Sequence, residues 1–157
     1  MSQTSVLDRI ASEQEDEPAY FSLLRERCYA EAVPLIRNAM ARDDGHAMGL
    51  YGSLLAIGQG IEKNLDEAAA WFRQGAVRGD VFSQLAFGVC LASGRGVALD
   101  QQEAAYWFFK AGSAGQIEAI SALSDIAGRN PGVIGPHFSL EQYLDLMTKL
   151  PRPDRVH

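Results

Sequence analysis

Hydrophobic positions recur at helical spacing along most of the chain. In segment 81–93 they stand at i, i+3, i+4, i+7 and i+8, which places them on one face of an α-helix. They are Ser83, Ala86, Phe87, Cys90 and Leu91. The same spacing recurs 36 residues earlier and 36 residues later, at Ala47, Leu50, Tyr51, Leu54 and Leu55, and at Ala119, Ala122, Leu123, Ile126 and Ala127. The pattern predicts amphipathic helices, and it predicts no paired strands in residues 30–128.

Capping signals help to place the ends of these helices. Asn64 and Asp100 each stand three residues before a glutamate, and Ser139 stands three residues before a glutamine. Such pairs can satisfy each other's backbone N–H groups at the start of a helix. The expected helices span residues 18–27, 30–42, 45–57, 65–78, 81–93, 101–114, 117–127 and 140–149.

The central part of the chain is an internal repeat. Laid without a gap over residues 80–115, residues 44–79 give 12 identities in 36 positions. A fixed period of this length indicates stacked helix-pair units rather than one closed core. We therefore expect a single repeat domain over residues 17–150, between an acidic mobile tail at 1–16 and a short tail at 151–157. Its expected units are a degenerate N-terminal unit at 17–43, repeats at 44–79 and 80–115, and a degenerate C-terminal unit at 116–150.

The identities carry a family resemblance. They include a Gly-x-Gly loop at Gly58 and again at Gly94, a Trp-Phe pair at Trp71 and again at Trp107, and a closing glycine. These units resemble the Sel-one-like repeat, a relative of the tetratricopeptide repeat. The resemblance implies an all-α, right-handed α/α solenoid of about eight helices, used as an adaptor or scaffold and commonly bacterial. The units lack the cysteine pairs of secreted members, which removes the expectation of disulfides.

Composition narrows the classes of function. The formal charge of −6 argues against nucleic-acid binding, which needs clustered Lys and Arg. The chain shows neither a secretory signal pattern nor an apolar stretch long enough to span a bilayer, so we expect a cytoplasmic protein without membrane insertion. Cys28 and Cys90 have no redox or zinc spacing, and we expect reduced, packed thiols.

Several residues could suggest chemistry, but a structural role explains each of them better. The paired glycines lack the strand and fuller motif of a nucleotide-binding loop, and they suit a tight turn at positive φ. Trp71 and Trp107 suit core packing between helices better than a box for an aromatic ligand. The three histidines lack ligand spacing, and capping explains Glu67 and Glu103. We therefore expect no catalytic residue, no metal and no cofactor.

A candidate interaction surface lies opposite the core stripe of each first helix. In helical repeats of this type the first helices line the concave side, so these positions would form a groove with a hydrophobic centre and an acidic end. The nine positions are His46, Gly49 and Ser53, then Phe82, Leu85 and Val89, then Glu118, Ser121 and Asp125. The alternative is that Phe82, Leu85 and Val89 only pack against neighbouring units.

These features favour a non-enzymatic module that binds a peptide or protein along its concave face. A more specific hypothesis is a bacterial cytoplasmic immunity or chaperone-like protein that neutralises a toxin or a secreted effector. An enzyme or small-molecule binder is the competing class, and no nucleophile, base and orienting residue can be assembled from the chain. We expect a monomer, or weak self-association through a solenoid end.

The sequence predicts that folding needs no metal or cofactor, because every core stripe has an apolar partner. Treatment with EDTA should leave the helical circular dichroism signal unchanged. A loss of helicity in the chelator would show that a bound metal completes the fold.

Overall fold

The all-helical prediction is confirmed. The computed structural model describes residues 17–152, and within this range it contains eight α-helices, one 3₁₀ helix and no strand. The elements are α2 (Ala19–Arg25), α3 (Tyr29–Ala41), α4 (Gly45–Ile57), α5 (Leu65–Val77), α6 (Val81–Ser93), α7 (Gln101–Ser113), α8 (Ile117–Arg129), η1 (Pro131–Val133) and α9 (Leu140–Met147). Each expected helix matches one of them with ends that differ by at most two residues. The predicted tail at 1–16, and residues 153–157 of the second tail, lie outside the described residues.

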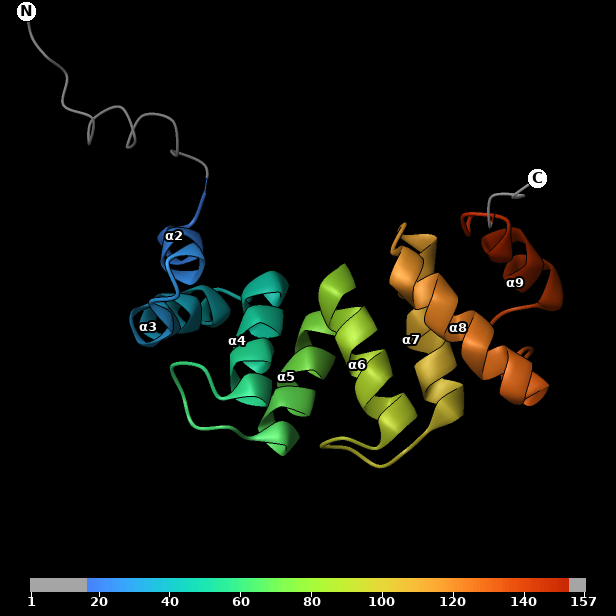
Figure 1. Ribbon diagram of the computed structural model, residues 1–157, viewed down its shortest axis with the longest axis horizontal. Helices are drawn as coiled ribbons and strands as arrows, with labels where there is room; N and C mark the ends of the chain where they lie inside the picture. The colour runs from blue at the N-terminus through green and yellow to red at the C-terminus, as the bar shows by residue number, and fades with distance from the viewer. Residues whose placement is uncertain (1–16, 153–157) are drawn as a thin grey trace, which may run out of the picture.

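The helices form an elongated array, in which each packs mainly on the next from α2 to α8. Figure 1 shows α2 and α3 at one end of this array and α9 at the other. The first helices of the two clear repeats, α4 and α6, also pack directly against each other. The last helix, α9, packs on both α7 and α8 and ends the described array. This arrangement is a helical-repeat solenoid.

In each of the two central helix pairs, an aromatic ring of the second helix packs against a glycine of the first helix. A Cβ atom added to Gly52 of α4 would lie 2.8 Å from Cε1 of Phe72 in α5. One period later, a Cβ atom on Gly88 of α6 would lie 2.7 Å from Cε1 of Phe108 in α7. Both rings are buried, so each helix pair depends on the missing side chain of its glycine.

The helix starts confirm the predicted caps but correct part of their chemistry. The side chains of Asn64 and Asp100 each accept a hydrogen bond of 3.0 Å from the backbone N–H of the glutamate three residues on. The glutamates do not return the bond. Glu67 instead accepts a hydrogen bond of 3.4 Å from the indole Nε1 of Trp71, and Glu103 accepts the same bond from Trp107. The expected reciprocal capping box is therefore wrong at these two helices and is present only in α9, between Ser139 and Gln142.

The glycine loops have the predicted left-handed backbone. Gly60 and Gly96 have φ angles of 69° and 71°. Both also touch the preceding unit. A Cβ atom on Gly60 would lie 2.5 Å from the carbonyl carbon of Tyr29 at the start of α3, and one on Gly96 would collide with the carbonyl oxygen of Leu65 at the start of α5. Each loop is thus seated on the second helix of the unit before it.

We predict that Gly96→Ala destabilises the protein by about 3 kcal/mol, because it combines a positive φ with a collision against backbone. Gly115→Ala is the matched control. Gly115 has a φ of 100° but nothing within 4 Å of its added Cβ, so it should lose only about 1 kcal/mol. Urea unfolding of both variants measures the difference, and equal losses would show that the loop contact has no energetic role.

Candidate functional site

The three residues of α6 in the candidate groove surround one cavity. Phe82 and Val89 keep 41% and 45% of their surface exposed, and Leu85 is half-buried. They line a cavity of about 390 Å³ together with Ile57, at the end of α4, and Phe72 of α5. The ring of Phe82 meets that of Phe72 edge-on, with centroids 6.3 Å apart. These side chains therefore pack against the preceding unit and also remain open to solvent.

The three groove positions of α4 lie outside this cavity. His46 is exposed, and its Nδ1 atom lies 3.1 Å from Oδ1 of Asp80, the residue that caps α6. Gly49 is buried, and a Cβ atom there would lie 3.3 Å from Cδ1 of Phe82. Ser53 is half-buried and donates a hydrogen bond of 3.0 Å to the carbonyl of Gly49. Gly49 thus packs next to Phe82 and, being buried, presents no surface to a partner.

The three groove positions of α8 form a separate, polar surface. Glu118, Ser121 and Asp125 are all exposed, and none of them lines the cavity next to α6. Phe82, Leu85 and Val89, the hydrophobic centre of the predicted groove, therefore lie together around one cavity. Gly49 of α4 adjoins that centre, whereas His46, Ser53 and the three α8 residues do not line its cavity.

Cys90 and Arg95 also line the α6 cavity. Both cysteines are half-buried, so the expected packing of their thiols is met only in part. Burial raises the pKa of the Cys90 thiol. A raised pKa lowers the fraction of reactive thiolate at neutral pH, which makes Cys90 a poor nucleophile.

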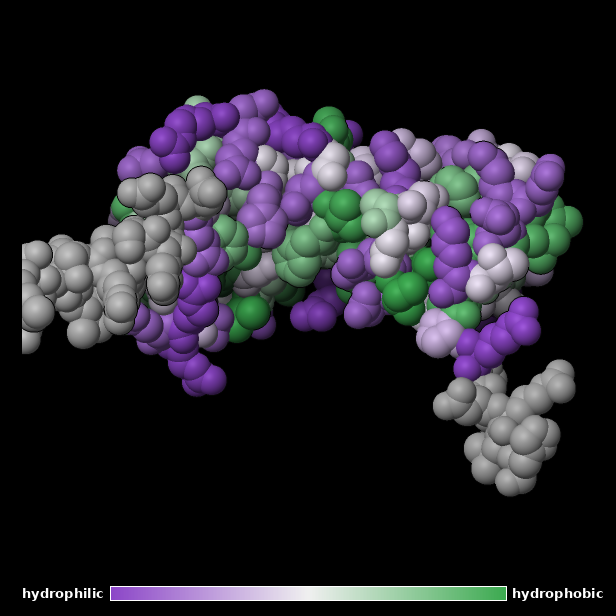
Figure 2. Space-filling model, turned by 90° about the horizontal axis from the view of Figure 1, so that it is seen from above, coloured by the Kyte–Doolittle hydropathy of each residue, from purple (hydrophilic) through white to green (hydrophobic). Residues whose placement is uncertain are grey.

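Hydrophobic side chains reach the surface around the middle of the array, between hydrophilic side chains, as Figure 2 shows. In residues 17–152 no group of three or more His, Cys, Asp and Glu side chains is placed to hold a metal ion. Of the helices in the same range, none combines the length and apolar character that crossing a bilayer needs.

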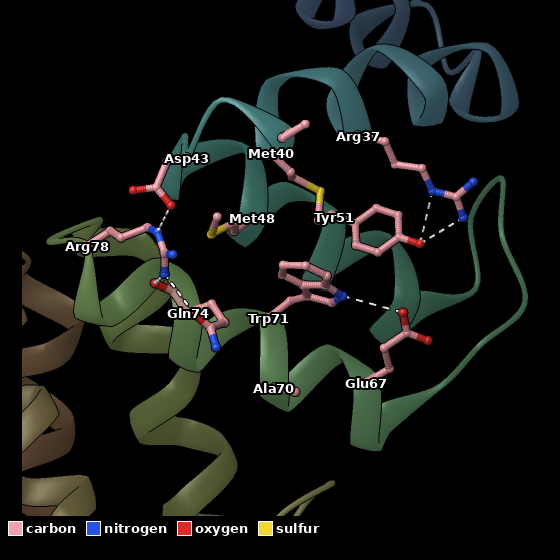
Figure 3. A pocket seen from close by; sticks show the side chains of 11 residues that line it. Arg37, Met40, Asp43, Met48, Tyr51, Glu67, Ala70, Trp71, Gln74 and Arg78 are labelled. Atoms are coloured by element: carbon pink, nitrogen blue, oxygen red, sulfur yellow. Dashed lines mark hydrogen bonds and ion pairs between the residues drawn. The ribbon is translucent and has the colours of Figure 1, made fainter.

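A larger hollow lies between α3, α4 and α5, and the sequence analysis did not find it. It has a volume of about 790 Å³. Figure 3 shows Trp71 and Tyr51 facing one another, with Met40 and Met48 beside them. The two rings meet edge-on, with centroids 5.8 Å apart. The hollow therefore has an aromatic and thioether wall, which suits a bulky apolar group.

Charged side chains stand at both sides of this hollow (Figure 3). On one side, Arg78 Nε donates a hydrogen bond of 2.6 Å to Asp43. On the other side, Arg37 donates from Nη2 to the Tyr51 hydroxyl over 2.9 Å, and its guanidinium carbon lies 5.4 Å from the centre of the same ring. Glu67 stands on this second side as well, next to the indole N–H of Trp71. Two cations and two anions line the hollow, so their formal charges cancel.

The predicted core packing of the tryptophans holds for Trp107 and in part for Trp71, which packs against the core from its edge. Trp107 is buried, with 6% of its surface exposed, and packs edge-on against Phe87 as expected of a core residue. Trp71 is only half-buried, because one side of its indole faces the hollow. The two repeats thus use the same tryptophan in different ways.

Comparison with known proteins agrees with this geometry. A profile of the Sel1 repeat matches residues 45–80 and 82–116, which are the two predicted repeats to within two residues. The chain contains two Sel1 repeats. The predicted resemblance to Sel-one-like repeats is therefore confirmed. A search of curated proteins finds no match.

Two solved structures share the Sel1 architecture. The Sel1 repeat protein from Oxalobacter formigenes is 32% identical, with a TM-score of 0.60, and the match covers 62% of this chain. A protective antigen of uropathogenic Escherichia coli with an SLR fold is 27% identical, with a TM-score of 0.66, over 77% of this chain. The chain spans 28% of the length of each of these proteins. Sel1 repeat proteins generally mediate protein–protein interaction and are generally non-enzymatic scaffolds.

The different surroundings of the two tryptophans predict different losses of stability. Trp107→Ala should cost about 4 kcal/mol, because it opens a cavity in a closed core. Trp71→Ala should cost about 2 kcal/mol, because one side of the indole faces a hollow that already exists. Chemical denaturation followed by circular dichroism compares the two, and equal losses would contradict an open hollow at Trp71.

Proposed function

We propose that this chain is a non-enzymatic adaptor that binds an apolar segment of a protein partner in the cavity next to α6. The observation that carries the proposal is the exposure of three large apolar side chains around one cavity. Phe82 and Val89 come from α6, and Ile57, which is 62% exposed, comes from the end of α4. Exposed apolar groups concentrated in this way are typical of interaction sites.

Binding would rest on shape and on the removal of apolar surface from water. Phe82 is held by the ring of Phe72 and by close packing over Gly49, so little side-chain freedom remains to be lost when a partner binds. A rigid aromatic residue at the centre of an interface is the usual form of a binding hot spot. We therefore assign the largest energetic contribution to Phe82.

Charge indicates what would flank the apolar segment of the partner. The chain carries a formal charge of −6. Glu118 and Asp125 are exposed on α8, the first helix of the unit that follows α6. Basic residues beside the apolar anchor would complement this surface and speed association. Both solved relatives come from bacteria, which supports a bacterial adaptor.

The double variant Phe82→Ser, Val89→Ser should lose partner capture while it remains folded, because both side chains are already half-exposed. Loss of a central aromatic anchor costs about 2 kcal/mol or more of binding free energy. Affinity purification from the source cell with mass spectrometry identifies the captured protein, and thermal melting reports the fold. Arg73→Ala, on the exposed side of α5, is the control and should capture the partner normally.

Alkylation of Cys90 gives a second measurement within the same cavity. In a Cys28→Ser background at alkaline pH, where the Cys90 thiol is ionised, the captured partner should slow the reaction of Cys90 with iodoacetamide, since Cys90 lines the cavity. A folded double variant that still captures the partner would place the binding site elsewhere. Unchanged alkylation of Cys90 in the complex would lead to the same conclusion.

A further inference from the structure

The two Sel1 repeats fill the space beside their tryptophans differently. In the second repeat, the Tyr106 ring lies 5.0 Å from the Trp107 ring, at an interplanar angle of 67°. The Lys110 ammonium lies 5.5 Å from the Tyr106 ring and 5.7 Å from the Trp107 ring. An aromatic ring and a cation, four residues apart on α7, therefore cover the indole, and Trp107 is buried.

The first repeat has no such cover. Ala70 stands where the second repeat has Tyr106, and Gln74 stands where it has Lys110. Ala70 is too short to reach across the indole of Trp71, and Gln74 accepts a hydrogen bond of 2.7 Å from Arg78 at the side of the hollow. The short side chain of Ala70 and the displaced side chain of Gln74 therefore leave open a space that the second repeat fills.

Polar contacts join the side chains on each side of the hollow. Asp43 occupies the position that Gly79 and Gly115 have at the end of the two clear repeats, and it has a φ of 67°. This left-handed conformation is costly for a residue with a side chain, and here it accompanies the contact between Asp43 and Arg78. On the other side, Tyr51 holds the guanidinium of Arg37. A preformed hollow binds with less loss of conformational entropy.

We propose that the hollow is a second binding site, separate from the α6 cavity, for a helical segment of a protein partner that presents an aromatic and a basic side chain four residues apart. The two cavities share no lining residue. The partner would supply to Trp71 the ring and the cation that Tyr106 and Lys110 supply to Trp107. This inference does not depend on the proposed function of the α6 cavity.

One carboxylate at the hollow, that of Glu67, is placed to pair with a basic segment. Arg78 is paired with Asp43, and Arg37 rests on the ring of Tyr51. Among residues 17–152, the carboxylate of Glu67 accepts a long hydrogen bond of 3.4 Å from the indole N–H, and its remaining acceptor sites can pair with an incoming ammonium group. A cation over the face of an indole adds a further attraction. The charge of −6 on the whole chain also favours a positively charged partner.

The test uses three fluorescein-labelled, alanine-rich helical peptides of equal length. One carries Tyr and Lys four residues apart, the second carries Tyr and Glu, and the third carries Ala and Lys. Fluorescence anisotropy with the full chain should show saturable binding of the first peptide. The other two should bind about tenfold more weakly, since each lacks one of the two groups that cover an indole.

Variants of the chain test whether the Tyr-Lys peptide binds in the hollow. Ala70→Tyr should abolish binding of the Tyr-Lys peptide and leave the melting temperature unchanged or higher, because the second repeat accommodates tyrosine at this position. Val77→Tyr is the matched control on the same helix. Val77 is exposed and does not line the hollow, so this variant should bind normally. Glu67→Gln should weaken binding of the same peptide several-fold, which keeps the site testable if Ala70→Tyr does not fold.

Three results would overturn the proposal. Equal or tighter binding of the Tyr-Glu peptide would mean that Arg37 selects a carboxylate instead. Unchanged binding of the Tyr-Lys peptide by a folded Ala70→Tyr variant would place its site elsewhere on the chain. Absence of saturable binding by all three peptides would show that the hollow does not recognise a helical aromatic-basic segment.

Discussion

The fold of the two clear repeats depends on close contact between an aromatic ring of the second helix and a glycine of the first helix. Phe72 lies against Gly52, and Phe108 lies against Gly88, at distances that leave no room for a Cβ atom. This contact lets the two helices of a unit approach closely enough to bury their alanines, such as Ala68 and Ala104. Small residues at such an interface exclude water without needing large side chains. The other packing of the two repeats, including both cavities, is built around these closed pairs.

Much of the architecture could be predicted from the sequence because two successive repeats carry the same pattern of core, cap and glycine positions. The period of 36 residues, the spacing of core positions and the cap residues Asn64 and Asp100 gave the same helices independently. The reciprocal capping box failed for a physical reason that is visible only in three dimensions. Trp71 and Trp107 stand one helical turn after the glutamates and offer them an indole N–H, which competes with the backbone of the cap.

The candidate sites were less accessible to prediction. The apolar centre at Phe82 and Val89 follows from helical periodicity, because these positions stand opposite the core stripe. The hollow around Trp71 does not follow from periodicity, since it depends on where the α3 residues Arg37 and Met40 lie relative to α5. A sequence signal for it did exist. It was the difference between the repeats at Ala70 and Tyr106, which the alignment of identical positions does not display.

The glycine loops pack on the preceding units, and this contact should make neighbouring units unfold together. The Gly60 loop touches the start of α3, and the Gly96 loop touches the start of α5. These two interfaces between units are therefore each made twice, once by packed helices and once by a glycine loop. A strong coupling between neighbours makes partly unfolded arrays costly, because opening one unit leaves two loose boundaries. A chain with few repeats and such contacts should behave as one cooperative unit, in spite of its modular sequence.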